Sequence, residues 1–194
     1  ELTLGTADFT VVPAPAAAFA IQKPATITVG SFTTVTVHAV DAFGNTDTAY
    51  NVEVILNADG SATVTGLVDI ISGEGSINLN DTIAEFVHLS LTDTQGTLLD
   101  VTSTENVIFW AGAATRLVIL DPFDGTAGGT VNVALRALDV FGNVDNSFNS
   151  GALLNVSGSA VTSGLVSFVN GVGAAMVQDL RAENVTLSLS DSLG

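Results

Sequence analysis

Alternation of apolar and polar residues is the main pattern along the chain, and it predicts β-strands. Within residues 32–40, Val35 and Val37 alternate with polar residues, so the apolar side chains would face one side of a strand. The same period of two recurs in residues 51–57 and 86–92. No helical period continues for a comparable length. The pattern predicts an all-β protein of short antiparallel strands with one face in a core.

This strand pattern occurs twice along the chain. The sequence Asp41-Ala-Phe-Gly-Asn45 returns as Asp139-Val-Phe-Gly-Asn143, and the two copies align at an offset of 98 residues without insertion or deletion. Roughly a third of the aligned positions are identical, which identifies a tandem repeat. We therefore predict two tandem β-sandwiches of about seven antiparallel strands each, at residues 13–110 and 111–194.

Apolar positions that are matched between the two copies predict the two cores. We expect eight of them to be buried: Val35, Val37, Leu89, Leu91, Val133, Leu135, Leu187 and Leu189. Residues 62–71 are expected to form one further strand. The Asp-x-Phe-Gly-Asn turns follow the strands that end at Val40 and Leu138.

The order of these motifs resembles a known family. A strand, an Asp-x-x-Gly-Asn turn, further strands, the run Val87-x-Leu-Ser-Leu-Thr-Asp93 and a short closing strand are similar to the bacterial immunoglobulin-like repeats of surface adhesins, invasin-type proteins and cell-envelope arrays. The resemblance covers essentially the whole chain. It implies immunoglobulin-like sandwiches in an exported, non-catalytic building block on the cell surface, and it carries no site residues.

Composition narrows the classes of function. Asp and Glu number 20 against 4 Lys and Arg, which gives a net charge of −16. Such a surface repels phosphate backbones, so no nucleic-acid partner is expected. Cysteine is absent, and no apolar run approaches the roughly 18 residues of a membrane helix. The two histidines lie on polar strand faces, and no catalytic motif is present, so the sequence does not predict an enzyme.

The repeated turns carry oxygen-bearing side chains that suit calcium, which prefers carboxylate and carbonyl ligands. The candidate ligands are Asp41, Asn45 and Asp47 in the first copy, and Asp139, Asn143 and Asp145 in the second. The alternative is that Asp and Asn bond to the backbone of their own turns. No other cofactor is expected.

The ends of the chain predict how copies assemble. Residues 1–12 align with residues 99–110, the closing strand of the first copy, whereas the second copy stops at Gly194, the equivalent of Gly96. We expect residues 1–12 to be a donor strand that completes the second sandwich of a neighbouring copy. The assembly-strand residues are Leu2, Leu4, Phe9, Val11 and Val12, and the acceptor residues are Val185, Leu187 and Leu189.

The sequence thus predicts a structural subunit of an extracellular filament or surface array, a head-to-tail homopolymer joined by donor strands. The alternative is a fragment of a long repetitive surface adhesin that binds a glycan or protein receptor. Sequons at Asn80, Asn155 and Asn184 permit attached glycans.

Overall fold

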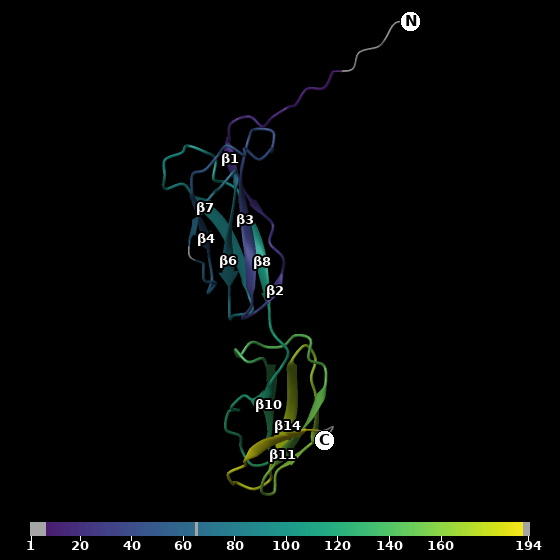
Figure 1. Cartoon of the computed structure of the whole chain (residues 1–194). Helices are drawn as coiled ribbons and strands as arrows, with labels where there is room; N and C mark the ends of the chain where they lie inside the picture. The colour runs from purple at the N-terminus through teal and green to yellow at the C-terminus, as the bar shows by residue number, and fades with distance from the viewer. Residues whose placement is uncertain (1–6, 65, 192–194) are drawn as a thin grey trace, which may run out of the picture. The chain divides into compact units, whose positions relative to one another are not determined.

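The computed structural model describes residues 7–64 and 66–191, and within them it contains fifteen strands and no helix. The chain divides into two compact units between Phe109 and Trp110, named unit 1 and unit 2 here (Figure 1). Among these residues no helix is long and apolar enough to cross a membrane. The predicted all-β fold of two immunoglobulin-like sandwiches is confirmed.

Unit 1 is a sandwich of a three-stranded and a five-stranded sheet. Its strands are β1 (Ala18–Gln22), β2 (Ile27–Thr28), β3 (Phe32–Val40), β4 (Val54–Ala58), β5 (Leu67–Val68), β6 (Glu74–Asn80), β7 (Phe86–Thr92) and β8 (Glu105–Trp110). One sheet has the order β1-β3-β6 and the other the order β2-β8-β7-β4-β5. The strand β8 therefore lies inside its sheet, between β2 and β7.

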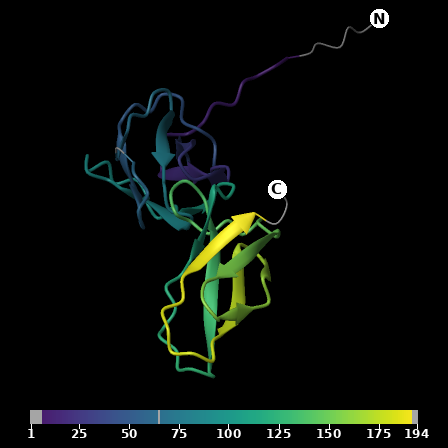
Figure 2. The ribbon, with the colours of Figure 1, turned by 90° about the horizontal axis from the view of Figure 1, so that it is seen from below.

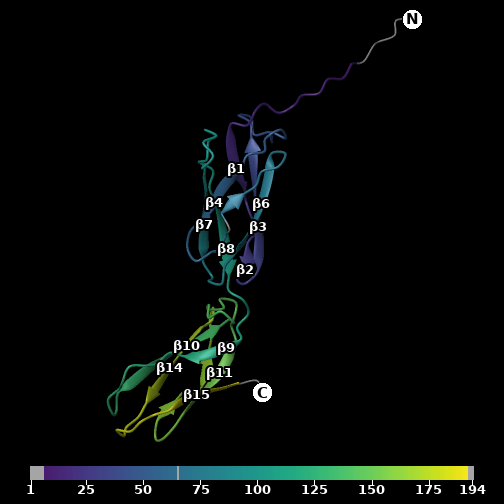
Figure 3. The same ribbon diagram turned by 60° about the vertical axis from the view of Figure 1, so that its left-hand side comes forward.

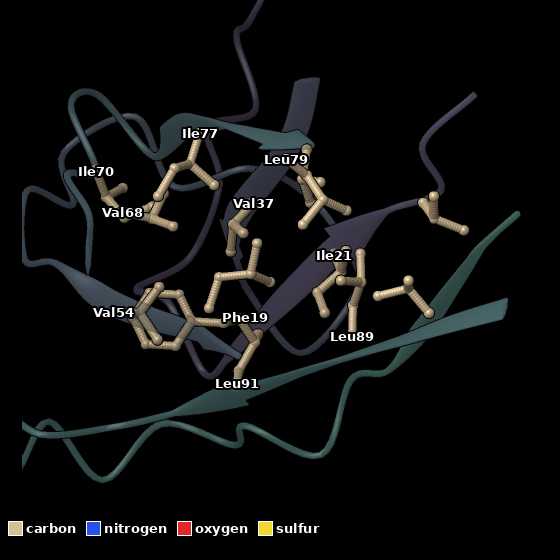
Figure 4. Packing of buried hydrophobic residues seen from close by; sticks show 14 of the residues in the cluster. Phe19, Ile21, Val37, Val54, Val68, Ile70, Ile77, Leu79, Leu89 and Leu91 are labelled. Atoms are coloured by element: carbon tan, nitrogen blue, oxygen red, sulfur yellow. The ribbon is translucent and has the colours of Figure 1, made fainter. Parts of the chain in front are cut away.

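The core of unit 1 lies between these two sheets, because alternate residues of each strand point inward. Phe19, Val37 and Leu89 are among the buried side chains that meet there (Figure 4). Phe19 also packs edge-to-face on Tyr50, with ring centroids 5.5 Å apart.

Unit 2 repeats this architecture with fewer strands. Its strands are β9 (Arg116–Ile119), β10 (Thr130–Leu138), β11 (Gly151–Val156), β12 (Val161–Thr162), β13 (Leu165–Ser167), β14 (Val172–Gln178) and β15 (Leu187–Asp191). They form sheets of order β12-β14-β10-β9 and β13-β11-β15. Figure 3 labels β9, β10 and β14 of the first sheet and β11 and β15 of the second. The edge-to-face pair Phe148–Phe168, with centroids 5.3 Å apart, repeats the aromatic pair of unit 1.

Three sequence-based expectations are wrong in detail. Unit 1 has eight strands rather than seven. In residues 62–64 and 66–71, the described part of that range, the one strand is β5, which pairs with β4 over two residues. Six of the eight predicted core residues are buried, but Leu187 and Leu189 are only half-buried. The physical reason lies in the open side of unit 2.

Candidate assembly site in unit 2

In unit 1 the strand β8 closes one side of the sandwich. It pairs antiparallel with β7 from Phe86↔Ile108 to Leu89↔Glu105. Val107 and Phe109 point inward and are each 1% exposed. The N–H of Phe109 also donates to the carbonyl of Glu85 at 2.9 Å. One strand therefore completes a backbone ladder and fills the core at the same time.

Unit 2 has no such strand within residues 110–191. Its last strand β15, the yellow arrow in Figure 2, pairs with β11 from Ala152↔Asp191 to Val156↔Leu187. Among the described residues, no strand pairs with its other side. Residues 184–186, which match Phe86–His88 of β7, form no strand. These are positions that β8 pairs with in unit 1, so the shortening of β15 follows from the missing neighbour.

A cleft of about 1290 Å³ opens along this side of unit 2, between its two sheets. Its apolar lining includes Ile119, Val131, Val133, Val177, Val185 and Leu187. The predicted acceptor residues Val185, Leu187 and Leu189 are half-buried, whereas the matching Val87, Leu89 and Leu91 of unit 1 are buried. An apolar cleft beside an unpaired strand edge is a surface that proteins seldom leave uncovered.

The rim of the cleft is acidic. Asp121, Asp124, Asp179 and Glu183 border it, and Arg181 is the one basic residue there. The backbone N–H of Arg181 and the hydroxyl of Ser159 donate to Asp179 and hold its pKa below the ordinary value. Asp179 is therefore ionised at neutral pH.

The described part of the predicted assembly strand, residues 7–12, has no strand partner among the described residues of its own chain. Residues 7–12 form no strand, and Phe9 and Val11 are 88% and 82% exposed. Val12 is also exposed, while Leu2 and Leu4 lie outside the described residues. Figure 1 shows residues 7–17, which precede β1, as a trace without an arrow. An apolar segment with an unpaired backbone can therefore add to a sheet edge.

The repeated Asp-x-Phe-Gly-Asn turns are held by their own aspartates. In unit 1, one oxygen of Asp41 accepts the backbone N–H groups of Phe43 and Asn45, each at 2.9 Å. The Asn45 side-chain amide donates to both carboxylate oxygens. This amide, together with the backbone donors, lowers the pKa of Asp41 from 3.8 to about 2. Gly44 completes the turn with a φ of +85°, a conformation that favours glycine.

The same aspartates also fasten the segment that enters each sandwich. The Ala14 N–H donates to Asp41 at 3.0 Å, and the Ala16 N–H donates to Asp47 at 2.9 Å. In unit 2 the equivalent donors are Gly112 to Asp139 at 2.9 Å and Ala114 to Asp145 at 2.8 Å. Burial raises the pKa of Asp139, but hydrogen bonds from Asn143, Gly112 and Phe141 outweigh burial and lower it.

These contacts bear on the predicted calcium ligands. N–H donors already occupy the carboxylate oxygens of Asp41 and Asp139. Among residues 7–64 and 66–191 no three His, Asp or Glu side chains converge on one point. Calcium at these turns stays a prediction, and it requires a melting temperature that falls when a chelator is added. An unchanged melting temperature would leave only the hydrogen-bonded turns.

Sequence reasoning missed the fastening of the entering segments, because the bonded residues are 27 and 31 positions apart. One feature of the sequence could have indicated these bonds: the separations of 27 and 31 residues recur in the second copy, between Gly112 and Asp139 and between Ala114 and Asp145.

Together, the strands and their sheets define the fold class: tandem immunoglobulin-like β-sandwiches. The sequence matches no protein-family model, and no curated protein sequence matches it. Several solved structures are similar.

The chain is similar to invasin, described as a bacterial integrin-binding protein, with a TM-score of 0.55 and 13% identity over 94% of this chain and 39% of invasin. It is also similar to FdeC, an adhesin of Escherichia coli, with a TM-score of 0.49 and 18% identity over 94% of this chain and 62% of FdeC. InvD of Yersinia pseudotuberculosis gives a TM-score of 0.46 and 19% identity over 92% and 57%. The invasin likeness confirms the expected immunoglobulin-like fold.

Proposed function

We propose that this protein is a non-catalytic structural subunit of an extracellular filament or surface array. In this proposal, residues 1–12 of one copy insert into the open side of unit 2 in the next copy. The observation that carries the proposal is the cleft beside the unpaired edge of β15, at the place that β8 fills in unit 1.

The register of the inserted strand follows from the repeat. The 98-residue offset places Phe9 where Val107 lies and Val11 where Phe109 lies. Since both unit 1 residues are buried, Phe9 and Val11 should point into the cleft. Thr10 and Val12 take the places of Ile108 and Trp110, whose side chains are less buried.

The pairing of β8 with β7 transfers in the same way. Val87↔Val107 and His88↔Asn106 become Val185↔Phe9 and Thr186↔Asp8, now between two copies. Backbone hydrogen bonds would extend the ladder of β15 through residues 184–186. Burying each large apolar side chain contributes roughly 1.5–3 kcal/mol, before the cost of ordering the strand is subtracted.

This contact joins two different surfaces of the same molecule, so each copy offers both a strand and a cleft. Such a heterologous contact repeats along a line when it does not close on itself, and the product is a fibre. The invasin-like fold and the strongly acidic composition support a location at the cell surface.

Deleting residues 1–12 tests the proposal. The full chain should form fibres in negative-stain images, and the truncated chain should form none while keeping the same melting temperature for unit 1. Mixing the truncated chain with the full chain should cap and shorten the fibres. Fibres of unchanged form from the truncated chain alone would contradict strand exchange.

A second candidate is a segment of a longer repetitive adhesin that binds a glycan or protein receptor. The likeness to invasin and FdeC supports it, since both are described as binding or adhesive proteins. In that case the residues that follow in the array would close unit 2. Glycan-array binding that is equal for the full and truncated chains would favour this role over assembly.

A further inference from the structure

The outer face of the four-stranded sheet of unit 2 differs from the same face of unit 1. On β12 and β14, Val161, Val172 and Met176 are 61%, 50% and 60% exposed. Their counterparts in unit 1 are Thr63, Glu74 and Asn78. A mostly polar surface has therefore become an apolar one.

The replacement of polar residues by apolar ones also extends to the neighbouring strand β10. In unit 1, Thr36 and Ser76 share a hydrogen bond of 3.2 Å across β3 and β6. Their counterparts in unit 2 are Ala134 and Ala174, which are paired across β10 and β14. The polar cross-strand contact is thus absent from the unit 2 face.

Basic residues gather on the same face. Arg136 on β10 pairs with Val172 on one side and Val118 on the other, and Arg116 lies on β9 opposite Leu138. Both arginines are exposed. Within the described part of the chain the ion pair found is His38–Glu74, so neither arginine has a carboxylate within 4.0 Å. We name the set Arg116, Val118, Ala134, Arg136, Val161, Val172, Ala174 and Met176 the basic-apolar face.

Charge is distributed unequally between the units. Unit 1 has thirteen Asp and Glu residues and one Lys, whereas unit 2 has seven and three Arg, which gives net charges of −12 and −4. All arginines of the chain thus lie in unit 2. A partner for the basic-apolar face should be acidic with an exposed apolar centre.

Unit 1 carries a patch of that kind at the turn before β6. Asp69, Ile71 and Glu74 line one small hollow, and Ile71 is 65% exposed. The Glu74 carboxylate lies 3.9 Å from His38, a contact that leaves its side chain 59% exposed. The matching residues of unit 2 are Ser167, Val169 and Val172, which carry no charge. We name the unit 1 set the acidic-apolar patch.

We propose that the basic-apolar face of unit 2 docks the acidic-apolar patch of unit 1 in a second copy, a contact between copies that is separate from strand exchange. Ile71 would pack on the apolar centre around Met176, and Asp69 and Glu74 would meet Arg136 and Arg116. Both surfaces are present on every chain, so the contact can link filaments side by side.

The test uses the full chain with Phe9→Asp and Val11→Asp, which blocks strand exchange, so its outcome does not depend on the proposed filament. Sedimentation equilibrium should show weak self-association of this parent. Arg116→Glu with Arg136→Glu should weaken it at least about tenfold, because like charges then face each other. Asp69→Arg with Glu74→Arg should do the same, and Lys23→Glu, a charge reversal at an exposed residue outside both sets, should change it little.

Mixing the two charge-reversed proteins decides the matter. Each protein should self-associate poorly on its own. In the mixture, the reversed face of one protein meets the reversed patch of the other with opposite charges, so association between the two proteins should return close to the parent value. No self-association of the parent, or no recovery in the mixture, would overturn the proposal. A third result would also overturn it. If the parent does not self-associate but is retained on a polyuronate column, and this retention requires Arg116 and Arg136, then the face binds a polyanion instead.

Discussion

Phe9 provides the sharpest test of the inserted strand. We expect a labelled peptide of residues 1–12 to bind the chain that lacks those residues, and Phe9→Ala in the peptide to weaken binding. Phe9 is 88% exposed in its own chain and would move to the place of Val107, which is 1% exposed. Burial of such a side chain contributes roughly 1.5–3 kcal/mol. Since about 1.4 kcal/mol is tenfold in affinity, the Kd should rise about 10- to 100-fold.

The matched control is Val12→Ala in the same peptide. Val12 takes the place of Trp110, which is 54% exposed and points outward, so this change should alter the Kd by less than about threefold. Fluorescence anisotropy of the labelled peptide measures both. A Val12→Ala effect as large as that of Phe9→Ala would place the strand one residue out of register. Absence of binding by the unaltered peptide would refute the reasoning.

Three further predictions concern the turns and the charged rim. The folded pKa of Asp41 is below its unfolded value of 3.8, so its ionised form stabilises unit 1 above pH about 4, and this contribution is lost as the pH falls toward 2. Asp41→Asn should therefore lower the free energy of unfolding in urea at pH 6 and change it little near pH 2. Gly171→Ala should destabilise unit 2 more than Gly164→Ala in thermal unfolding. Both glycines have a positive φ, which costs alanine about 1–2 kcal/mol. Of the two, Gly171 is the one where the new Cβ would also clash with a backbone atom, the carbonyl oxygen of Asp145. Peptide binding should strengthen from about 0.01 to 0.15 M salt, because Asp8 approaches the acidic rim of the cleft and salt screens that repulsion; weaker binding at higher salt would contradict this.

Much of the fold is predictable from the sequence because strand alternation and the exact repeat reinforce each other. Val35 and Val133 occupy matched inward positions, and both are fully buried. Leu187 shows the limit of this reasoning. Its alternation is the same as that of Leu89, but burial depends on a neighbouring strand that the described part of unit 2 does not contain. The alternation of apolar and polar residues indicates which way a side chain points, but it does not indicate which strand covers that side chain.

The contacts of the repeated turns were less predictable. The sequence correctly places Asp41 in a turn, and the bonds to Phe43 and Asn45 follow from ordinary turn chemistry. The bond from Ala14 depends on how the entering segment passes the turn, 27 residues away. Likewise, the basic-apolar face becomes visible only when strand pairing shows which residues of β10 and β14 share one side of the sheet.

The most direct test of strand exchange is a disulfide between copies. The chain has no cysteine, so Asp8→Cys with Thr186→Cys introduces one defined pair. These positions match Asn106 and His88, which are cross-strand neighbours, and such neighbours have the roughly 4.5–5.5 Å Cα separation that a disulfide accepts. Oxidation should give a ladder of covalent multimers on a denaturing gel, whereas Thr10→Cys with Thr186→Cys, two residues out of register, should give little. Monomers alone, or equal ladders from both pairs, would contradict the account.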